Sequence, residues 1–246
     1  MKNFVINLGR QPQKYDAFLR LNAAAKIAFE RFEASDGALL SREDADGMKL
    51  VAPGSQFTPG AVGCAASHFR IWQQTVESGT PALVFEDDAI LRNDIKERLD
   101  FLLSTLTNWD YIALGYNTDL VLDLDWAPGM RAMLTFQPKY PSDENAIVFQ
   151  VSTAQVAAIR LNNCFATPGY VVSPAGARKL LQLCFPLDNR SCPVPALNAT
   201  ARVVGIDAML NTVYASIRAF ACFAPLVVTK NEQASSSVQT GAAQIW

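Results

Sequence analysis

Residues 58–88, TPGAVGCAASHFRIWQQTVESGTPALVFEDD, predict a helix, a buried strand and an acidic cluster in direct succession. Thr58 can cap the helix, Pro59 suits its first turn, and Gly79 suits its end. Apolar residues then recur at helical spacing, at Val62, Ala65, Ala66, Phe69, Trp72 and Val76. The run PALVF is apolar throughout and has the length of a strand buried on both faces.

The same alternation continues on both sides of this stretch. NFVINLG (3–9) predicts a strand followed by a helix, DIKERLDFLLSTL (94–106) a helix, and DYIALGY (110–116) a strand. In GYVVSPAGARKLLQL (169–183), a strand leads into a helix that begins at Pro174. Strands separated by helices predict an α/β fold with a mainly parallel central sheet flanked by helices.

The composition of the chain indicates how many domains it forms and which kinds of partner it lacks. A chain of 246 residues with 50% hydrophobic content can fill one large core, so we expect a single domain over 1–246. The net charge of −2 gives no footprint for nucleic acid. The sequence shows neither a signal-peptide core nor a spanning helix, which predicts a cytoplasmic protein with at most peripheral contact with the inner membrane. Five cysteines without a C-x-x-C spacing are interpreted as small buried hydrophobes.

Two segments interrupt the regular pattern. Residues 117–145 contain APG and QPKYPSDEN, and we expect an excursion over the surface there, on the acceptor side of any site. Residues 230–246 are polar and Ser-rich, which predicts a mobile tail. We expect the part over 230–240 to become ordered when a ligand binds.

The acidic cluster at the end of the PALVF strand predicts a bound cation. In an extended chain Glu86 and Asp88 would face one side and Asp87 the other, so the first two could hold Mn²⁺ or Mg²⁺ together with substrate phosphates. The alternative is that Asp87 and Asp88 lie in a solvated turn and cap the next helix. Asp123 and Asp125 form a rival pair of candidate metal ligands. Their alternation with apolar residues, however, predicts a strand with one face exposed to solvent.

His68 is the only histidine, which excludes two-histidine metal sites. It lies at the flank of the apolar stripe, and the pattern favours a structural hydrogen bond over a functional role. Gly60 and Gly63 are poor helix formers in the first turns of the same helix. They predict a close approach by another backbone or by a ligand.

Five stretches resemble glycosyltransferase family 25, which includes bacterial lipooligosaccharide galactosyltransferases and procollagen galactosyltransferases. They are FVINLGR (4–10), FEASDG (32–37), TPGAVGCAASHFRIWQQTVESG (58–79), ALVFEDDAIL (82–91) and GYVVSPAGARKLL (169–181). The ordered combination of G-x-x-G-C-x-x-S-H with E-D-D is more specific than either part. Two features depart from the family: Lys14 stands where an Arg is frequent, and 117–145 has no counterpart.

The resemblance implies a GT-A-like domain that binds a UDP-sugar and Mn²⁺ or Mg²⁺. It implies Glu86 and Asp88 as metal ligands. It implies donor-binding roles for Asn7, Leu8, Arg10, Asp36, Gly37, Ser67, His68, Glu86 and Asp87. An inverting transfer also needs a base. Asp207 is the candidate, because apolar neighbours would exclude water from its carboxylate and raise its basicity. A helix cap is the alternative role for Asp207.

The predicted function is therefore the inverting transfer of a hexose such as galactose from a UDP-sugar to a glycan such as lipooligosaccharide. The alternatives are a catalytically silent GT-A-like domain that binds a glycan or a protein, and a metal-dependent phosphohydrolase. The sequence identifies neither the sugar nor the acceptor, and it gives no oligomeric state.

Overall fold

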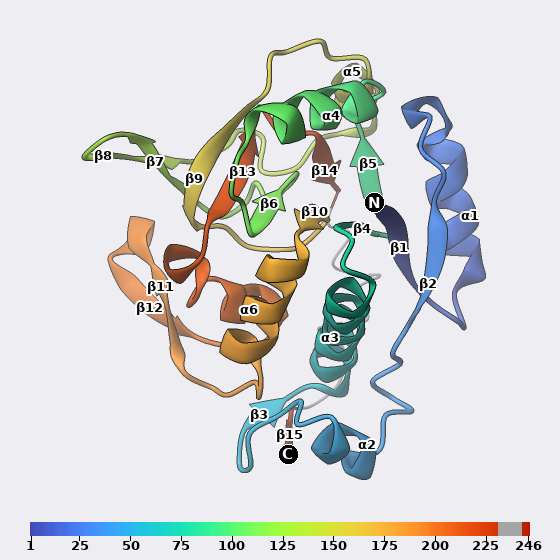
Figure 1. The fold of residues 1–246 in the computed structure, drawn as a ribbon, viewed down its shortest axis with the longest axis vertical. Helices are drawn as coiled ribbons and strands as arrows, with labels where there is room; N and C mark the ends of the chain where they lie inside the picture. Colours follow the sequence, from blue (N-terminus) through green and yellow to red (C-terminus); the bar gives the residue numbers. More distant parts are fainter. Residues whose placement is uncertain (231–242) are drawn as a thin grey trace.

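The computed structural model describes residues 1–230 and 243–246 of the chain (Figure 1). Its α-helices are α1 (Pro12–Leu21), α2 (Arg42–Gly47), α3 (Pro59–Ser78), α4 (Ile95–Thr105), α5 (Asp143–Gln150), α6 (Pro174–Cys184) and α7 (Ile206–Leu210). The strands of the first half are β1 (Lys2–Leu8), β2 (Glu30–Ala34), β3 (Gln56–Phe57), β4 (Ala82–Glu86), β5 (Ala89–Leu91), β6 (Tyr111–Ala113) and β7 (Leu122–Ala127). Those of the second half are β8 (Met130–Leu134), β9 (Ala157–Asn163), β10 (Gly169–Val172), β11 (Ser191–Val194), β12 (Ala199–Arg202), β13 (Ala219–Phe223), β14 (Val227–Thr229) and β15 (Gln244–Ile245).

Within the described residues, nine strands form one central sheet in the order β2-β1-β4-β10-β6-β13-β9-β7-β8. The pairs β1–β2, β1–β4 and β6–β13 are parallel, and β10 runs antiparallel between β4 and β6. Strands β9 and β8 are also antiparallel to their neighbours. Six of the nine strands therefore point in one direction, which confirms the predicted α/β class, while the antiparallel strands β10, β9 and β8 make the sheet a mixed one.

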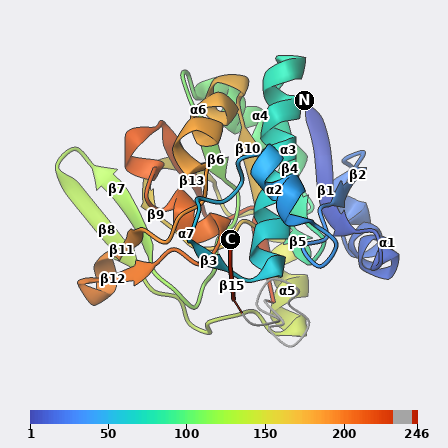
Figure 2. The same ribbon diagram turned by 90° about the horizontal axis from the view of Figure 1, so that it is seen from below.

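Helices cover both faces of this sheet (Figures 1 and 2). On one face, α3 and α6 pack on each other over Val84 and Tyr170. On the other face, Phe18 of α1 and Leu99 of α4 share a second cluster with Phe85. Neighbouring residues of β4 thus enter different cores, because side chains alternate across a strand. This two-sided burial is why PALVF is apolar at every position.

Helix α3 begins and ends where the sequence predicts. Thr58 Oγ1 accepts from the backbone N–H of Ala61 at 3.1 Å, and Pro59 is the first helical residue. Gly79 ends the helix with a φ of 64°, a left-handed conformation that favours glycine. The 20-residue helix therefore has a fixed first turn close to the edge of the sheet.

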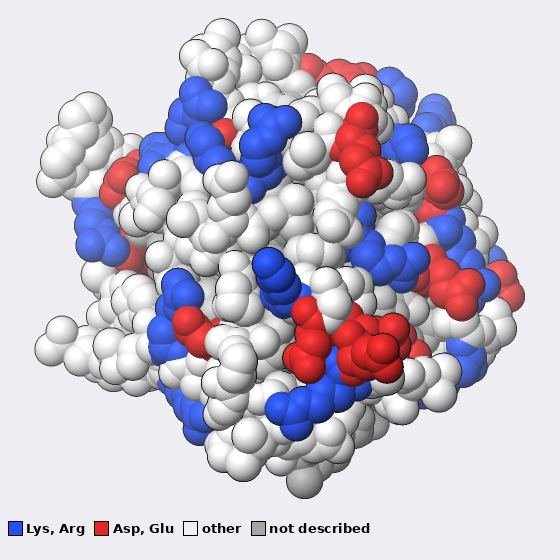
Figure 3. Space-filling model, turned by 60° about the horizontal axis from the view of Figure 1, so that its bottom comes forward, with Lys and Arg blue, Asp and Glu red and all other residues white. Residues whose placement is uncertain are grey.

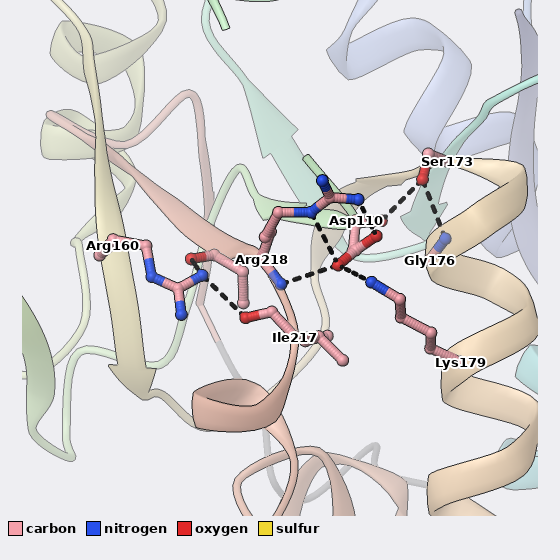
Figure 4. Close-up of polar contacts among 8 residues, drawn as sticks. Asp110, Arg160, Ser173, Gly176, Lys179, Ile217 and Arg218 are labelled. Atoms are coloured by element: carbon pink, nitrogen blue, oxygen red, sulfur yellow. Dashed lines mark hydrogen bonds and ion pairs between the residues drawn. The ribbon is translucent and has the colours of Figure 1, made fainter. Parts of the chain in front are cut away.

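Asp110 ties the sheet to α6 and β13 (Figure 4). Its buried carboxylate accepts from Lys179 Nζ at 2.6 Å, from Arg218 Nη2 at 3.2 Å and from the Arg218 backbone N–H at 2.8 Å. Burial would raise the pKa of Asp110, but the hydrogen bonds from Arg218 and Lys179 outweigh it and hold the pKa below its usual value. Gly176 lies so close that a Cβ there would be 1.9 Å from the Asp110 carbonyl oxygen.

The segment 117–145 adds the hairpin β7–β8 to the edge of the sheet and begins α5. Asp123 does not lie on a wet face as expected: it is fully buried and pairs with Arg131, whose Nε donates at 3.1 Å. Asp125 is exposed and accepts from Asn162 at 2.7 Å. The acceptor-side role of this segment stays a prediction.

The chain end is described only in part. The predicted ordering of residues 230–240 falls almost entirely outside the described residues. On either side of residues 231–242, β14 pairs with β5 and β15 pairs with β3. Trp246 is buried, and its Nε1–H donates to the Phe57 carbonyl at 3.1 Å.

Most of the cysteines are buried, as the sequence predicts. On the face that Figure 3 shows, basic and acidic side chains of the described residues are interspersed, without a broad basic field. Cys164, Cys184, Cys192 and Cys222 are buried thiols, and Cys64 is partly buried. In the part of the chain that the structure describes, none of the helices combines the length and apolar character needed to cross a membrane.

Candidate functional site

A pocket lies where the parallel strands β1, β2 and β4 end and α3 begins. Open α/β sheets bind ligands at this edge. The register places Ile6 beside Glu86 and Leu8 beside Ala34, so the loops that follow the three strands meet there. The pocket is lined by Ile6, Leu8, Arg10, Gln11, Lys14, Ala34, Ser35, Asp36, Gly37, Gly60, Cys64, Ser67, His68, Glu86 and Asp87.

The acidic cluster turns instead of continuing the strand. Strand β4 ends at Glu86, and Asp87 and Asp88 form the turn before β5. Asp87 accepts from Asn7 Nδ2 at 2.6 Å, and Asp88 accepts from Thr229 Oγ1 at 2.9 Å. The alternation expected for an extended chain therefore does not apply here. The turn alternative is correct in its conformation, although the cluster does not cap α4, which Asp94 precedes.

Glu86 is the most strongly perturbed carboxyl of the pocket. Burial, together with the charges of Asp88, Asp207 and Asp87, raises its pKa to about 8, against a hydrogen bond from Thr167 that lowers it. That bond runs from Thr167 Oγ1 to Glu86 Oε1 and is 2.6 Å long. A carboxyl held in this way takes up positive charge readily, as a proton or as a cation.

Asp87 has the same character in weaker form. Burial raises its pKa, whereas the hydrogen bond from Asn7 and the charge of Lys14 lower it. The effect of burial is the larger, and the pKa is raised. Asn7 is itself buried and also donates to the Gln11 carbonyl at 2.9 Å, while Arg31 Nε donates to its Oδ1 at 2.8 Å. The Asn7 amide therefore fixes the loop after β1 against the acidic turn.

The loops after β1 and β2 are joined by an ion pair. Arg10 Nε donates to Asp36 Oδ2 at 2.5 Å, and this bond lowers the pKa of Asp36. The Arg10 side chain is 54% exposed and the Asp36 side chain 15%, so the pair lies at the mouth of the pocket.

The loop after β2 lies directly against the first turns of α3. A Cβ on Gly63 would be 2.4 Å from the backbone nitrogen of Gly37, and one on Gly37 would be 1.7 Å from the Pro59 carbonyl oxygen. Ser67 Oγ accepts from the Ser35 backbone N–H at 2.9 Å and donates to the Gly63 carbonyl at 2.8 Å. Gly63 therefore serves the approach of another backbone, one of the two alternatives the sequence left open, while Gly60 lines the pocket.

His68 has the structural hydrogen bond that the sequence favoured. Its Nδ1 lies 2.8 Å from the Tyr170 hydroxyl on β10, and burial lowers its pKa to about 4. The ring also lines the pocket. The imidazole is thus neutral at pH 7 and is in contact with both the core and the pocket.

Asp207 lies in the first turn of α7, outside the pocket lining. Its Oδ1 accepts from its neighbour Ala208 N–H at 2.8 Å, and its Oδ2 accepts from Ala166 N–H at 3.3 Å. The alternative role as a helix cap is wrong, because Gly205 is the N-cap residue of α7 and the helix has no side-chain cap hydrogen bond. The carboxylate is nevertheless near enough to Glu86 to raise the pKa of that group.

Most of the residues predicted to bind the donor are brought together. Eight of the nine line the pocket: Leu8, Arg10, Asp36, Gly37, Ser67, His68, Glu86 and Asp87. Asn7 lies behind it, bonded to Asp87. The sequence reasoning missed Thr167, Tyr170 and Gln11. No local pattern around Glu86 could have identified Thr167, because the two residues are 81 positions apart along the chain.

The carboxylates of this site could supply only part of the coordination shell of a divalent cation. Among the described residues, no group of three or more His, Cys, Asp and Glu side chains is arranged to hold a metal ion. The charge of Asp88 contributes to the raised pKa of Glu86, so the two residues are electrostatic neighbours. Two such carboxylates suit Mg²⁺ or Mn²⁺ when phosphate oxygens and water complete the shell.

Similar proteins were found by sequence. A zebrafish (Danio rerio) procollagen galactosyltransferase 1 is 29% identical over 193 residues, covering 73% of this chain and 28% of that protein. A cattle (Bos taurus) protein named probable inactive glycosyltransferase 25 family member 3 is 29% identical over 191 residues, covering 72% and 28%. The chain thus matches little more than a quarter of the length of these relatives. Among solved structures, A197 from STIV covers 94% of this chain and 95% of its own at 11% identity, with a TM-score of 0.36 that carries no argument.

The match to a family is broader. The pattern described as "Glycosyltransferase family 25 (LPS biosynthesis protein)" matches residues 1–194, which include β1, β2, α3, β4 and thus every residue that lines the pocket. The relatives bear names of both active and inactive proteins, so membership alone does not decide whether this pocket catalyses a reaction. By the extent of that match, the chain belongs to glycosyltransferase family 25.

Proposed function

We propose that the chain transfers a hexose, with galactose as the first candidate, from a UDP-sugar to a glycan acceptor such as lipooligosaccharide, with inversion at the sugar. The observation that carries this proposal is the convergence of eight predicted donor-binding residues on one pocket beside a strongly perturbed carboxyl. Relatives named procollagen galactosyltransferase support galactose as the sugar.

In this proposal the pocket binds the nucleotide part of the donor. Arg10 and Lys14 line it and supply positive charge for phosphate oxygens, while Ser35 and Ser67 offer polar atoms near the start of α3. The N-terminal end of a helix favours a negative charge, and Gly60 in the first turn of α3 reaches the pocket. The loops fixed by Asn7 and Asp36 would hold these groups in place before the donor arrives.

Glu86 and Asp88 would hold Mn²⁺ or Mg²⁺ in this proposal. When bound, the cation supplies positive charge that stabilises the diphosphate as the sugar leaves. Asp207 is proposed as the group that takes the proton of the acceptor hydroxyl, since it lies within the electrostatic reach of Glu86. The proton transfer would need Asp207 to exchange at least one of its backbone hydrogen bonds for the acceptor.

Thermal stability with UDP and MnCl₂, added separately and together, tests this function. If carboxylates and diphosphate share the cation, the increase in Tm with both should exceed the sum of the separate increases. A ligand at 100 times its Kd adds about 2.7 kcal/mol to the free energy of unfolding. Asp125→Asn, which changes an exposed carboxylate of the rival pair, should keep this synergy. Additive shifts in the wild type would contradict a shared cation.

A donor screen then separates the enzyme from a silent domain. Slow hydrolysis of UDP-, GDP- and CMP-sugars in the presence of metal should be seen for a UDP-sugar alone. Relatives named as inactive make the silent domain the alternative to be excluded. Synergistic binding without turnover of any donor, with or without glycan acceptors, would favour that alternative.

A further inference from the structure

His68 joins a buried aromatic cluster to the pocket. The side chain is 1% exposed, and its Nδ1 lies 2.8 Å from the hydroxyl of Tyr170. The same hydroxyl oxygen accepts from Trp72 Nε1–H at 3.1 Å. At the other end of the imidazole, Nε2 is buried and has no hydrogen-bond partner among the described residues. The ring lines the pocket together with Ser67 and Glu86.

The three side chains allow two proton arrangements. In the first, the Tyr170 O–H donates to Nδ1 of His68 while its oxygen accepts from Trp72. All of their polar atoms are then used except Nε2, which carries the proton of the neutral ring. In the second, Nδ1–H donates to the Tyr170 oxygen, which then accepts twice. The Tyr170 hydrogen is left without an acceptor, although the residue is fully buried.

The first arrangement is the more stable one. A buried polar group without a partner costs about 1 to 3 kcal/mol. The first arrangement leaves one such group, the Nε2–H, whereas the second leaves two, the Tyr170 O–H and the lone pair of Nε2. In the first, the spare donor is Nε2–H, which belongs to a residue of the pocket lining and can be satisfied by a bound molecule. The Trp72 indole cannot exchange roles, because its nitrogen is a donor only.

We propose that Trp72 and Tyr170 fix His68 as the Nε2–H tautomer, so that the ring donates a hydrogen bond from the wall of the pocket to an uncharged acceptor oxygen, a carbonyl or hydroxyl, of the bound nucleotide sugar. The ligand part rests on the proposed function. His68 is the binding residue, and Tyr170 and Trp72 are positioning residues.

The chemistry of the neighbours supports this class of acceptor. Burial keeps the imidazole neutral at pH 7, with a pKa of about 4, so its N–H brings no positive charge. Arg10 and Lys14 line the same pocket and already provide charge for phosphate. A buried donor also discriminates: a ligand without an oxygen at that point leaves Nε2–H unpaired.

The tautomer can be measured directly because His68 is the only histidine. In protein labelled with ¹⁵N-histidine, a single pair of ring nitrogens is observed at pH 7 without ligand. We expect the shift of Nε2 to be that of a protonated nitrogen and the shift of Nδ1 that of an acceptor. Tyr170→Phe should produce a mixture of tautomers, whereas Tyr116→Phe removes a buried hydroxyl that bonds to Cys222 O and should change nothing. A protonated Nδ1 in the wild type would overturn the assignment.

The ligand is tested with UDP and UDP-galactose by calorimetry. The amide of Gln can place a donor near the Nε2 position, and that of Asn only near the Nδ1 position. His68→Gln should therefore stay within about twofold of the wild-type Kd, and His68→Asn should weaken binding about two- to tenfold. A loss for both ligands would place the acceptor oxygen on the nucleotide, and a loss for UDP-galactose alone would place it on the sugar.

Three outcomes would count against the inference. Equal affinity of His68→Asn and wild type for both ligands would overturn the donor role, and so would an unchanged Nε2 shift on saturation with both ligands. If neither ligand binds the wild type, the proposed function fails and the ligand step fails with it, while the tautomer is judged by the labelling experiment on the free protein.

Discussion

In the folded chain, the environment of the Glu86 carboxyl disfavours its negative charge. An isolated Glu has a pKa near 4.5, and burial and the charges of Asp88, Asp207 and Asp87 raise the pKa of Glu86 to about 8 in the folded chain. The folded state therefore binds this proton more tightly than the unfolded state does. Its contribution to stability is fully present below pH 4.5 and is lost as the pH rises through about 8.

Glu86→Gln should remove this loss. The amide is nearly isosteric, and its oxygen can still accept from Thr167. In urea denaturation without divalent ions, the variant should be more stable than the wild type at pH 9, with a difference that shrinks toward pH 4.5. Glu77→Gln, at an exposed position of α3, serves as the control and should show no such trend. A difference of the same size at pH 5 and pH 9 would contradict the assignment.

Asp88 is expected to contribute to the reaction more than to the fold. It is exposed in the turn after β4 and accepts a hydrogen bond from Thr229, so Asp88→Ala should leave the far-UV spectrum and the urea midpoint nearly unchanged. If it holds the cation, transfer should fall on the order of a thousandfold, as for the loss of a main electrostatic stabiliser. Assays of donor turnover against the Asp125→Asn control measure this. Near-normal turnover would rule out Asp88 as a metal ligand.

At the scale of elements, the first turns of α3 and the loop after β2 form one unit. Gly37 and Gly63 let the two backbones touch, and Ser67 bonds across the contact. The pocket wall that contains Asp36 is therefore positioned by packing against a helix that is itself capped at Thr58.

Gly63→Ala tests this contact with a change that would ordinarily favour a helix. Helix propensity alone would stabilise the chain by about 1 kcal/mol, but the added methyl group would meet backbone atoms of Gly37 and Ser35. We expect a net loss of about 1 to 3 kcal/mol in urea denaturation and weaker UDP binding. Gly47→Ala, in α2 with open space around it, should be neutral or stabilising. Equal effects of the two changes would contradict the close approach.

The sequence predicts elements whose signals are local. Thr58, Pro59 and Gly79 define α3 to the residue because caps act within one turn. The antiparallel position of β10 between β4 and β6 depends on pairing partners far along the chain, which no local pattern specifies. The family motifs indicated most of the pocket lining, whereas the Thr167 contact comes from a distant loop.

At the scale of the whole molecule, one buried charge adds to the apolar packing of α6 on the sheet. Asp110 accepts hydrogen bonds from Lys179 and Arg218, whose side chains are 40% and 46% exposed. The carboxylate is thus the enclosed member of the group, and the cations reach it from the surface. Because its pKa is lowered, its contribution is present above about pH 4 and is lost as the pH falls below that value.

Asp110→Asn should therefore lower global stability at pH 7 by about 2 kcal/mol, within the range for hydrogen bonds to charged groups. Asp188→Asn is the matched control, since Asp188 pairs with Arg190 at the surface, where a pair contributes about 1 kcal/mol or less. Urea denaturation at pH 7 and pH 3 compares them. The deficit of Asp110→Asn should shrink at pH 3, and a deficit as small as that of the control at pH 7 would contradict its role.

The enclosed thiols have a practical consequence for attaching a fluorescent dye. Maleimides react with the thiolate, and burial raises the pKa of Cys164, Cys184 and Cys222 to about 12 and that of Cys192 above its usual value. Cys64, which lines the pocket, has a pKa raised well above its usual value by burial and by the charges of Glu86 and Asp207. A cysteine introduced at an exposed position would ionise near pH 8.5 and react far faster than these native thiols. Single-site labelling should therefore be achievable at neutral pH without replacing them.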